Sequence, residues 1–382
     1  MPGPDPAARL AVSAVFVLNG VLVASWIVRI PDTQASLGIG EATLGLVLMG
    51  MAAGVLGALP LAGGAVARVG SRPVTIAGAT LGALALPLTS LAPSPIALAA
   101  CLVALGAGSA TMDVGMNAQG LGVEAGYGRS VLVGMHAAWS LGALVAAGGG
   151  AAVLAAQVPA GTHHAVVGGA VLVGTACASP WLRIRDRRSV HAHGRPPVFA
   201  LPTGVLVPIA LVAAGSGFAE SSASDWSGIH MRDTVGVGGG REAWGFVTFT
   251  AAMTVGRLLG DRVADRLGAT RTVAWGGRLA AAGFVLLATV PHVPGALVGF
   301  ACAGLGVASI VPLSFAAAGR ASTSPGAGMA AVATVGYTGF LLGPPLVGAV
   351  TEGLDLRVAL LVVGVAVLLA THRPTGFSTS PP

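Results

Sequence analysis

Long apolar segments alternate with short polar loops along the whole chain. A helix needs about 17–25 predominantly apolar residues to cross a bilayer, and the segments reach that length repeatedly. This pattern predicts an all-α integral membrane protein. The twelve predicted transmembrane helices lie near residues 10–28, 42–66, 73–91, 95–118, 130–156, 164–182, 199–223, 242–260, 271–290, 293–319, 327–351 and 356–371.

The sequence also repeats itself at an offset of 198 positions. Arg68 and Gly70, in the loop after the second predicted helix, match Arg266 and Gly268. Matching landmarks in both halves predict a duplicated unit, an arrangement common in transporters. The same offset relates Gly106 to Gly304, Gly108 to Gly306, and Trp139 to Tyr337.

From this repeat we expect two pseudo-symmetric lobes of six helices each. The first lobe covers residues 1–182, and the second covers residues 199–382. Residues 183–198 between them are polar and rich in arginine. We interpret that segment as a cytoplasmic linker and not as a domain.

Composition indicates that lipid surrounds most of the chain. Charged residues make up 9% of it and hydrophobic residues 54%, whereas an ordinary soluble domain has about 25% charged residues. The net charge of +6 does not indicate nucleic acid as a partner, because the arginines lie in short loops and not on one basic face. The sequence contains no lysine, which excludes a Walker-type phosphate loop. Its three cysteines lack the spacing of metal ligands.

The arginines predict the orientation of the chain. With the N-terminus inside, most of them fall on the cytoplasmic side, and Arg257 and Arg278 come near cytoplasmic helix ends. This bias follows the positive-inside rule and predicts a multi-pass protein of the cytoplasmic membrane with both termini in the cytoplasm. The exceptions, which fall outside, are Arg29, Arg232, Arg241 and Arg357.

The paired loops resemble the signature of the major facilitator superfamily, a Gly-x-x-x-Asp-Arg-x-Gly-Arg/Lys pattern between helices 2 and 3 that returns between helices 8 and 9. Finer features resemble a bacterial branch distantly similar to the fucose permease. The resemblance implies two six-helix lobes that give alternating access to a cavity between them. The segments that carry it are SWIVRIPDT, MDVGMNAQGLGVE, MHAAWSLG, SASDW, MTVGRLLGDRVADRLG and YTGFLLGPPLVG.

One loop departs from the family pattern, because Ala67 stands where the pattern has its acid, whereas the second loop keeps Asp265. In the family this acid is thought to face a helix N-terminus of the other lobe, where the helix dipole is positive. The resemblance therefore implies an inverted latch, with Asp265 facing the start of the fifth helix near Ser130. Alternatively, Asp265 pairs with an arginine of its own loop. The loop residues assigned to gating are Arg68, Gly70, Arg72, Asp261, Asp265, Arg266, Gly268 and Arg271.

Ionisable residues at membrane depth are the candidates for proton coupling, since a charge in hydrocarbon needs a partner or a task. Asp113 lies about 27 Å along the fourth predicted helix, and His136 about 9 Å along the fifth, so both reach the cytoplasmic half. Asn117 follows Asp113 by one turn on the same face. We interpret Asp113 and His136 as a carboxylate–imidazole couple that carries a proton. The alternative is a hydrogen-bonded clamp between the two helices.

A second acidic site lies in the outer part of the seventh predicted helix, where small residues surround Glu220 and Asp225. One interpretation gives them a role in binding substrate or a proton. A second makes one of them the partner of Arg29 in an extracellular gate. A third leaves Asp225 as a solvated loop residue.

Aromatic and amide side chains supply the candidates for ligand binding, since an aromatic face stacks on a sugar ring or another amphipathic solute. These candidates are Asn19, Asn117, Trp139 and Tyr337. Three other tryptophans are predicted to form an aromatic belt near the outer interface, namely Trp26, Trp226 and Trp244.

Together these features predict a secondary active transporter and not an enzyme. Its expected partners are a small-molecule substrate, protons and the lipid bilayer, with no cofactor and no metal, and it is expected to act as a monomer. Proton coupling is favoured because carboxylates lie at membrane depth and the sequence holds no ATP-binding motif. On the resemblance, a sugar or related polar solute is the leading substrate class. The alternatives are an exporter of amphipathic compounds and a non-transporting membrane sensor.

Overall fold

The computed structural model describes residues 4–128, 131–182, 201–322 and 324–377. The predicted linker, residues 183–198, lies outside the described residues, as does Ser130. The chain divides into two compact units. Unit 1 comprises Met1–Gly38 and Gly50–Arg195, and unit 2 comprises Ile39–Met49 and Pro196–Pro382. These units differ from the predicted lobes in the segment Ile39–Met49, which groups with the second half of the chain.

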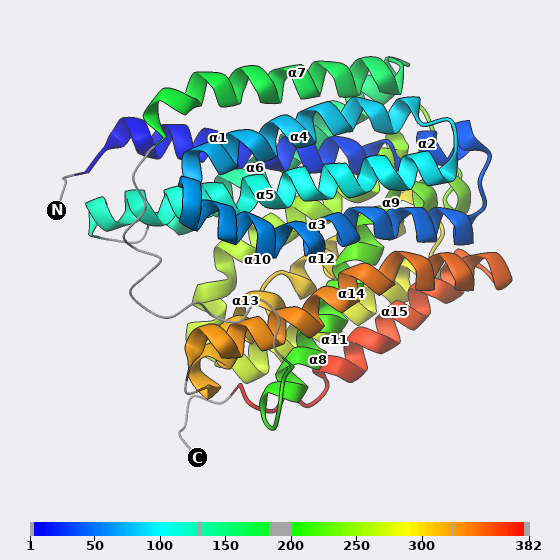
Figure 1. Cartoon of the computed structure of the whole chain (residues 1–382). Helices are drawn as coiled ribbons and strands as arrows, with labels where there is room; N and C mark the ends of the chain where they lie inside the picture. Colours follow the sequence, from blue (N-terminus) through cyan, green and yellow to red (C-terminus); the bar gives the residue numbers. More distant parts are fainter. Residues whose placement is uncertain (1–3, 129–130, 183–200, 323, 378–382) are drawn as a thin grey trace. The chain divides into compact units, whose positions relative to one another are not determined.

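The first half of the described chain is built from long helices (Figure 1). Within unit 1, α4 packs against α5 and α7, and α1 packs against α6 and α7. The helix α2 is a short addition that the hydrophobic pattern did not predict. In chain order the elements are α1 (Pro6–Val28), α2 (Ile30–Leu37), α3 (Glu41–Val69), α4 (Ser71–Leu91), α5 (Pro95–Tyr127), α6 (Leu132–Ala155), α7 (Ala160–Ala178) and the 3-10 turn η1 (Ser179–Trp181).

The second half of the chain repeats this helix packing, but two of its helical segments are interrupted, one between α8 and α9 and one between α12 and α13. Within unit 2, α11 packs against α12 and α15, α8 packs against α14, and α10 packs against α12. A π-helical turn, η2, follows α8 and α9. The elements are α8 (Leu206–Asp225), α9 (Ser227–Ile229), η2 (His230–Thr234), η3 (Arg241–Ala243), α10 (Trp244–Leu267), α11 (Ala269–Thr289), α12 (Val293–Val307), α13 (Ile310–Ala321), α14 (Pro325–Gly353) and α15 (Leu356–Thr371).

Within the described ranges, ten segments are long and apolar enough to cross a membrane, with Val293–Ala321 counted as one segment across α12 and α13. The observed helices follow the predicted segments closely, which confirms the all-helical membrane fold. The two remaining predicted crossings fall on α10, whose second half is rich in charge, and on α15, which has 16 residues. The number twelve therefore stays a prediction.

The internal repeat is visible in the backbone. Gly70, between α3 and α4, has φ 91° and ψ 165°, and Gly268, between α10 and α11, has φ 80° and ψ 153°. Side chains disfavour a positive φ of this kind, so glycine is required at both turns. The matched glycines of the two loops thus make the same turn 198 positions apart.

Glycine-mediated helix packing repeats at the same offset. A Cβ atom added at Gly106 would collide with the carbonyl oxygen of Met51, and one added at Gly304 would collide with that of Phe249. Phe249 itself stands 198 positions after Met51. Small residues of this kind let helix backbones touch, which is the main packing device inside a bilayer.

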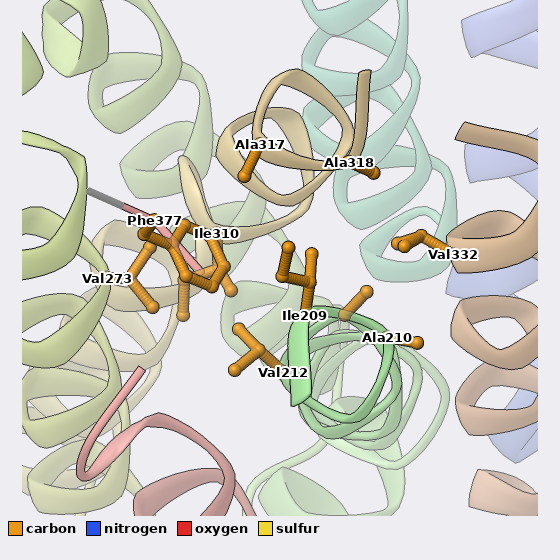
Figure 2. Packing of buried hydrophobic residues seen from close by; sticks show 10 residues of the cluster. Ile209, Ala210, Val212, Val273, Ile310, Ala317, Ala318, Val332 and Phe377 are labelled. Carbon is orange, nitrogen blue, oxygen red and sulfur yellow. The ribbon is translucent and has the colours of Figure 1, made fainter. Parts of the chain in front are cut away.

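A buried apolar cluster forms the core of unit 2, with residues from α8, α11, α13 and α14 and with Phe377, which lies beyond the end of α15 (Figure 2). Phe377 is 1% exposed and lies beside Val273 and Ile310 at one side of the cluster. The cluster comprises Ile209, Ala210, Val212, Ala213, Val273, Ile310, Ala317, Ala318, Val332 and Phe377.

We expect Gly106→Leu to lower the stability of unit 1, because the new side chain must push α3 away from α5. Overpacking of this kind costs about 1–3 kcal/mol. The measurement is the monodisperse yield and the melting temperature Tm in detergent. Gly57→Leu is the matched control, since a Cβ atom at Gly57 meets nothing within 4 Å. Equal Tm values for the two variants would contradict the packing argument.

Candidate functional site

Asn19 on α1 joins three helices of unit 1. Its Oδ1 accepts a hydrogen bond from Nε1 of Trp139 on α6 at 2.9 Å, and its Nδ2 donates to the carbonyl oxygen of Ser109 on α5 at 3.1 Å. Asn19 and Trp139, two of the predicted ligand-binding residues, are therefore hydrogen-bonded to each other. Asn19 is 2% exposed and uses both ends of its amide, so it orients the indole, whereas Trp139 itself stays partly exposed.

Asp113 finds its partner on its own helix. Nδ2 of Asn117 donates to Oδ1 of Asp113 at 3.1 Å and to its carbonyl oxygen at 2.9 Å. His136 is exposed on α6 and meets the ring of Phe16 edge-on, with centroids 5.0 Å apart. Adjacency in sequence did not make α5 and α6 main packing partners, because α5 packs chiefly on α4 and α6 on α1. The Asp113–His136 couple stays a prediction.

The start of α6 carries an acidic cap from within unit 1. Oε2 of Glu124, near the end of α5, accepts hydrogen bonds from the backbone N–H groups of Val131 at 2.8 Å and Leu132 at 2.9 Å. A carboxylate satisfies such free N–H groups and interacts favourably with the helix dipole. Sequence reasoning assigned this helix start to Asp265 and overlooked Glu124, which closes the MDVGMNAQGLGVE segment.

The loop residues assigned to gating lie at the two matched turns, which Gly70 and Gly268 form. Asp265 is exposed and, among the residues that the structure describes, forms no ion pair with an arginine of its own loop. The latch near Ser130 falls outside the described residues and stays a prediction. Across the described ranges, no ion pair involves Arg68, Arg72, Asp261, Asp265, Arg266 or Arg271.

Arg29 is 2% exposed and is saturated with partners from unit 1. Its Nη1 pairs with the carboxylate of Asp32 on α2 at 2.5 Å, and its Nη2 donates to the carbonyl oxygen of Val158 at 2.8 Å. Its Nε donates to Nδ1 of His163 on α7 at 3.3 Å. This cluster ties α2 to α7. A gate pair of Arg29 with Asp225 stays a prediction.

His164 extends this polar network into the core of unit 1. Its Nδ1 lies 2.6 Å from Oγ of Ser90 and 3.2 Å from Oγ1 of Thr89, and its Nε2 lies 3.3 Å from the carbonyl oxygen of Ser25. The network joins α1, α4 and α7. Sequence reasoning missed it, and the only available signal was the pair of adjacent histidines at the start of an apolar segment.

The acidic site of unit 2 has a basic partner. Nη2 of Arg257 on α10 lies 3.3 Å from Oε1 of Glu220 on α8, and the two side chains are 35% and 19% exposed. That Arg257 lies near a cytoplasmic helix end stays a prediction. Helix α10 continues beyond Arg257 to Leu267, about 15 Å further, through a segment rich in charge. Glu220 lies in α8, one of the ten segments long and apolar enough to cross a membrane.

The residues that follow Glu220 differ from their predicted settings. Asp225 is half-buried as the last residue of α8 and leads directly into α9, so it is not a loop residue. Trp26 is 1% exposed and Trp226 is 0% exposed, so the predicted aromatic belt is wrong for both, because they pack inside their units. Trp244, at 41% exposure, does lie on the surface.

Tyr337 on α14 is partly exposed, and its ring centroid lies 6.5 Å from that of Phe340. It belongs to unit 2 and Trp139 to unit 1, so their joint role in ligand binding stays a prediction. Among the residues that the structure describes, no group of three or more His, Cys, Asp and Glu side chains is arranged to hold a metal ion.

His230 is buried, and neither of its ring nitrogens has a hydrogen-bond partner in the part of the chain that the structure describes. It lies in the π-helical turn η2, and its ring meets Phe300 of α12 edge-on at 5.8 Å between centroids. Burial lowers the pKa of His230 to about 4, and the positive charge of Arg357 acts in the same direction, while Asp355 opposes them. The imidazole is therefore neutral at pH 7.

Comparison with known proteins gives one consistent result. The profile of the Major Facilitator Superfamily matches residues 209–372. An uncharacterized MFS-type transporter of Yersinia pestis is 30% identical over 369 residues, which is 96% of this chain and 94% of that protein. The crystal structure of the nucleoside transporter NupG has a TM-score of 0.77 at 15% identity and covers 95% of this chain and 97% of its own. A bacterial homolog of the human lysosomal transporter Spinster, inward-facing and unoccupied, has a TM-score of 0.79 at 14% identity with both chains fully covered.

We expect Asn19→Ala and Trp139→Phe to show coupled effects, since each removes one side of the same buried hydrogen bond. Asn19→Ala should destabilise more, by about 1–3 kcal/mol, because it also leaves the Ser109 carbonyl oxygen without its donor. Tm in detergent and the emission spectrum of Trp139 provide the measurement. Strictly additive Tm changes in the double variant would argue against the bond.

We expect His230→Phe to reduce the acid sensitivity of the protein. The unfolded chain takes up a proton near the usual histidine pKa of about 6.5, whereas folded His230 stays neutral down to about 4. Between these values the unfolded state binds more protons, so His230 lowers stability as the pH falls, by up to about 3 kcal/mol.

The check is Tm measured from neutral pH down to pH 4 in detergent. His372→Gln is the control, because His372 is exposed at the end of α15 and its loss should leave the wild-type pH profile in place. Parallel profiles for wild type and His230→Phe would show that His230 does not set the acid limit.

Proposed function

Because the chain belongs to the major facilitator superfamily, we propose that it is a proton-coupled secondary transporter of a small polar solute. It works by alternating access in the cytoplasmic membrane, as a monomer with both termini in the cytoplasm. The family supplies the transporter fold and the membrane setting. Proton coupling, the substrate class and the orientation are the parts proposed here.

The observation that carries proton coupling is the ion pair of Glu220 and Arg257. An ion pair in a low-dielectric setting is strong only while both groups are charged. Protonation of Glu220 removes the pair and frees Arg257, which loosens the link between α8 and α10. Both side chains are partly exposed, so a proton and a polar solute have access to them. We place Glu220 within the membrane because α8 is long and apolar enough to cross it, and ionisable residues in such segments mark ion and substrate pathways.

Unit 1 supplies a second candidate for proton transfer. Asp113 keeps one carboxylate oxygen outside its hydrogen bond to Asn117, and His136 is exposed on the neighbouring α6. We retain the two as a carboxylate–imidazole couple that hands a proton along the pathway. We keep the pair of Arg29 and Asp225 as the proposed outer gate. The two arginine-bearing loops around Gly70 and Gly268 form the proposed inner gate.

The substrate class rests on the aromatic positions and on the motif resemblance to the fucose permease branch. Trp139 offers an indole whose orientation Asn19 fixes, and a fixed aromatic face favours a flat or ring-shaped solute. Tyr337 occupies the matching place in the second repeat and adds a phenolic hydroxyl. A sugar or a related hydroxylated solute fits this chemistry.

The test begins with a thermal-shift screen of sugars and polyols on the purified protein at two pH values, followed by uptake into proteoliposomes with an imposed pH gradient. We expect Glu220→Gln to lose uphill accumulation of the solute and to keep solute exchange, because exchange needs no net proton movement. Asp113→Asn tests the two interpretations of Asp113. If Asp113 is a coupling site, the variant should lose uphill accumulation and keep exchange, and if it is a clamp between helices, the variant should only lower Tm.

Asp233→Asn is the matched control, since Asp233 also pairs with an arginine but lies exposed outside the predicted spans. Uphill accumulation that survives in Glu220→Gln would overturn the role given to this pair. Proton-driven efflux of amphipathic compounds would support an exporter instead. The absence of flux for every solute would support a membrane sensor.

A further inference from the structure

One face of α11 combines positive charge with an exposed aromatic ring. Arg271, Trp275 and Arg278 follow one another at spacings of four and three residues, which places them on the same side of the helix. Trp275 is 59% exposed, and both arginines are exposed. The guanidinium carbon of Arg278 lies 4.9 Å from the centroid of the Trp275 ring. We call these three residues the α11 patch.

The α11 patch has no anionic partner among the residues that the structure describes. Throughout the described ranges, neither Arg271 nor Arg278 forms an ion pair. The same helix also exposes apolar side chains, with Leu279, directly after Arg278, at 38% and Val285, about two turns further on, at 47%. A helix that exposes such side chains over its length faces lipid. An arginine on that face needs a counter-ion, and the described part of the chain shows none.

Packing against α15 fixes the depth of the patch. A Cβ atom added at Gly277 would collide with the side chain of Thr371, so the two helices touch there. Thr371 is the last residue of α15, and the exposed polar residues His372 and Arg373 follow it. Arg278, next to Gly277, is therefore level with the point where α15 leaves the apolar region. Tryptophan is enriched at this boundary between lipid and water.

From this arrangement we propose that the α11 patch binds the phosphate group of an anionic phospholipid. The lipid belongs to the leaflet at which α11 begins, which the arginine distribution predicts to be the cytoplasmic one. Arginine offers a planar fork of donors that matches phosphate oxygens, and Arg271 and Arg278, about two turns apart, hold a single headgroup from both sides. The indole of Trp275 packs at the level of the glycerol and keeps Arg278 oriented through its ring face. The site rests on the membrane setting alone and not on the proposed transport cycle.

The test compares phosphatidylcholine nanodiscs with and without added phosphatidylglycerol. The measurements are Tm and the number of phosphatidylglycerol molecules that the protein retains in native mass spectrometry. The wild-type Tm should rise when phosphatidylglycerol is present. Arg271→Gln with Arg278→Gln should abolish that rise, with phosphatidylglycerol binding weakened about fivefold for each arginine removed. Trp275→Ala should weaken binding with no change in charge.

Arg262→Gln with Arg320→Gln is the matched control. Both arginines are exposed and predicted on the same side of the membrane, and their removal changes the net charge by the same amount. This control should keep the wild-type response. The proposal is overturned if the wild-type Tm does not respond to phosphatidylglycerol, or if the control loses the response as fully as the patch variant. Equal Tm values for all variants in pure phosphatidylcholine establish that each one is folded.

Discussion

The interior of a bilayer contains no water, so every polar side chain that enters it must find a partner inside the protein. This constraint explains why Arg29 and Asn19, two buried polar side chains of unit 1, have several hydrogen-bond partners each. Arg29 engages Asp32, His163 and the Val158 carbonyl oxygen, so that one guanidinium ties a short helix to α7. Asn19 divides its amide between α5 and α6. In each case a single buried group sets the relative placement of two or three helices.

Close helix contact is the condition under which these polar partners can meet. Lipid tails are as apolar as leucine, so helices in a bilayer gain little from hiding apolar surface and rely on close packing instead. Gly106 and Gly304 provide it at equivalent points of the two repeats, against Met51 and Phe249. The duplication is therefore kept where backbones touch. It is lost at Asn19, because the position 198 residues later is Gly217, which has no side chain to bond an aromatic partner.

The proposed transport chemistry uses the polar contacts that are not closed off. Asn19 and Arg29 are buried and fully bonded, which suits positioning. Glu220 and Arg257 are bonded to each other but remain partly exposed, so their pairing is open to a proton or a solute. The α11 patch lies at the other extreme, since its exposed arginines form no ion pair among the described residues and are proposed to bind lipid. The buried polar groups that are bonded within the protein thus hold its helices together. The partly exposed charged groups are the ones available to a proton, a solute or a lipid.

The sequence alone determined the membrane setting, the helical segments, the repeat at 198 positions and the family resemblance. These features depend on hydropathy, helical period and loop residues, which are properties of neighbouring positions along the chain. Only the tertiary structure decided which side chains pair. Arg257 meets Glu220, Glu124 caps α6, and Trp226 is buried and not part of a surface belt. Such pairings depend on the rotation and packing of whole helices, and a shift of one residue around a helix moves a side chain by about 100°.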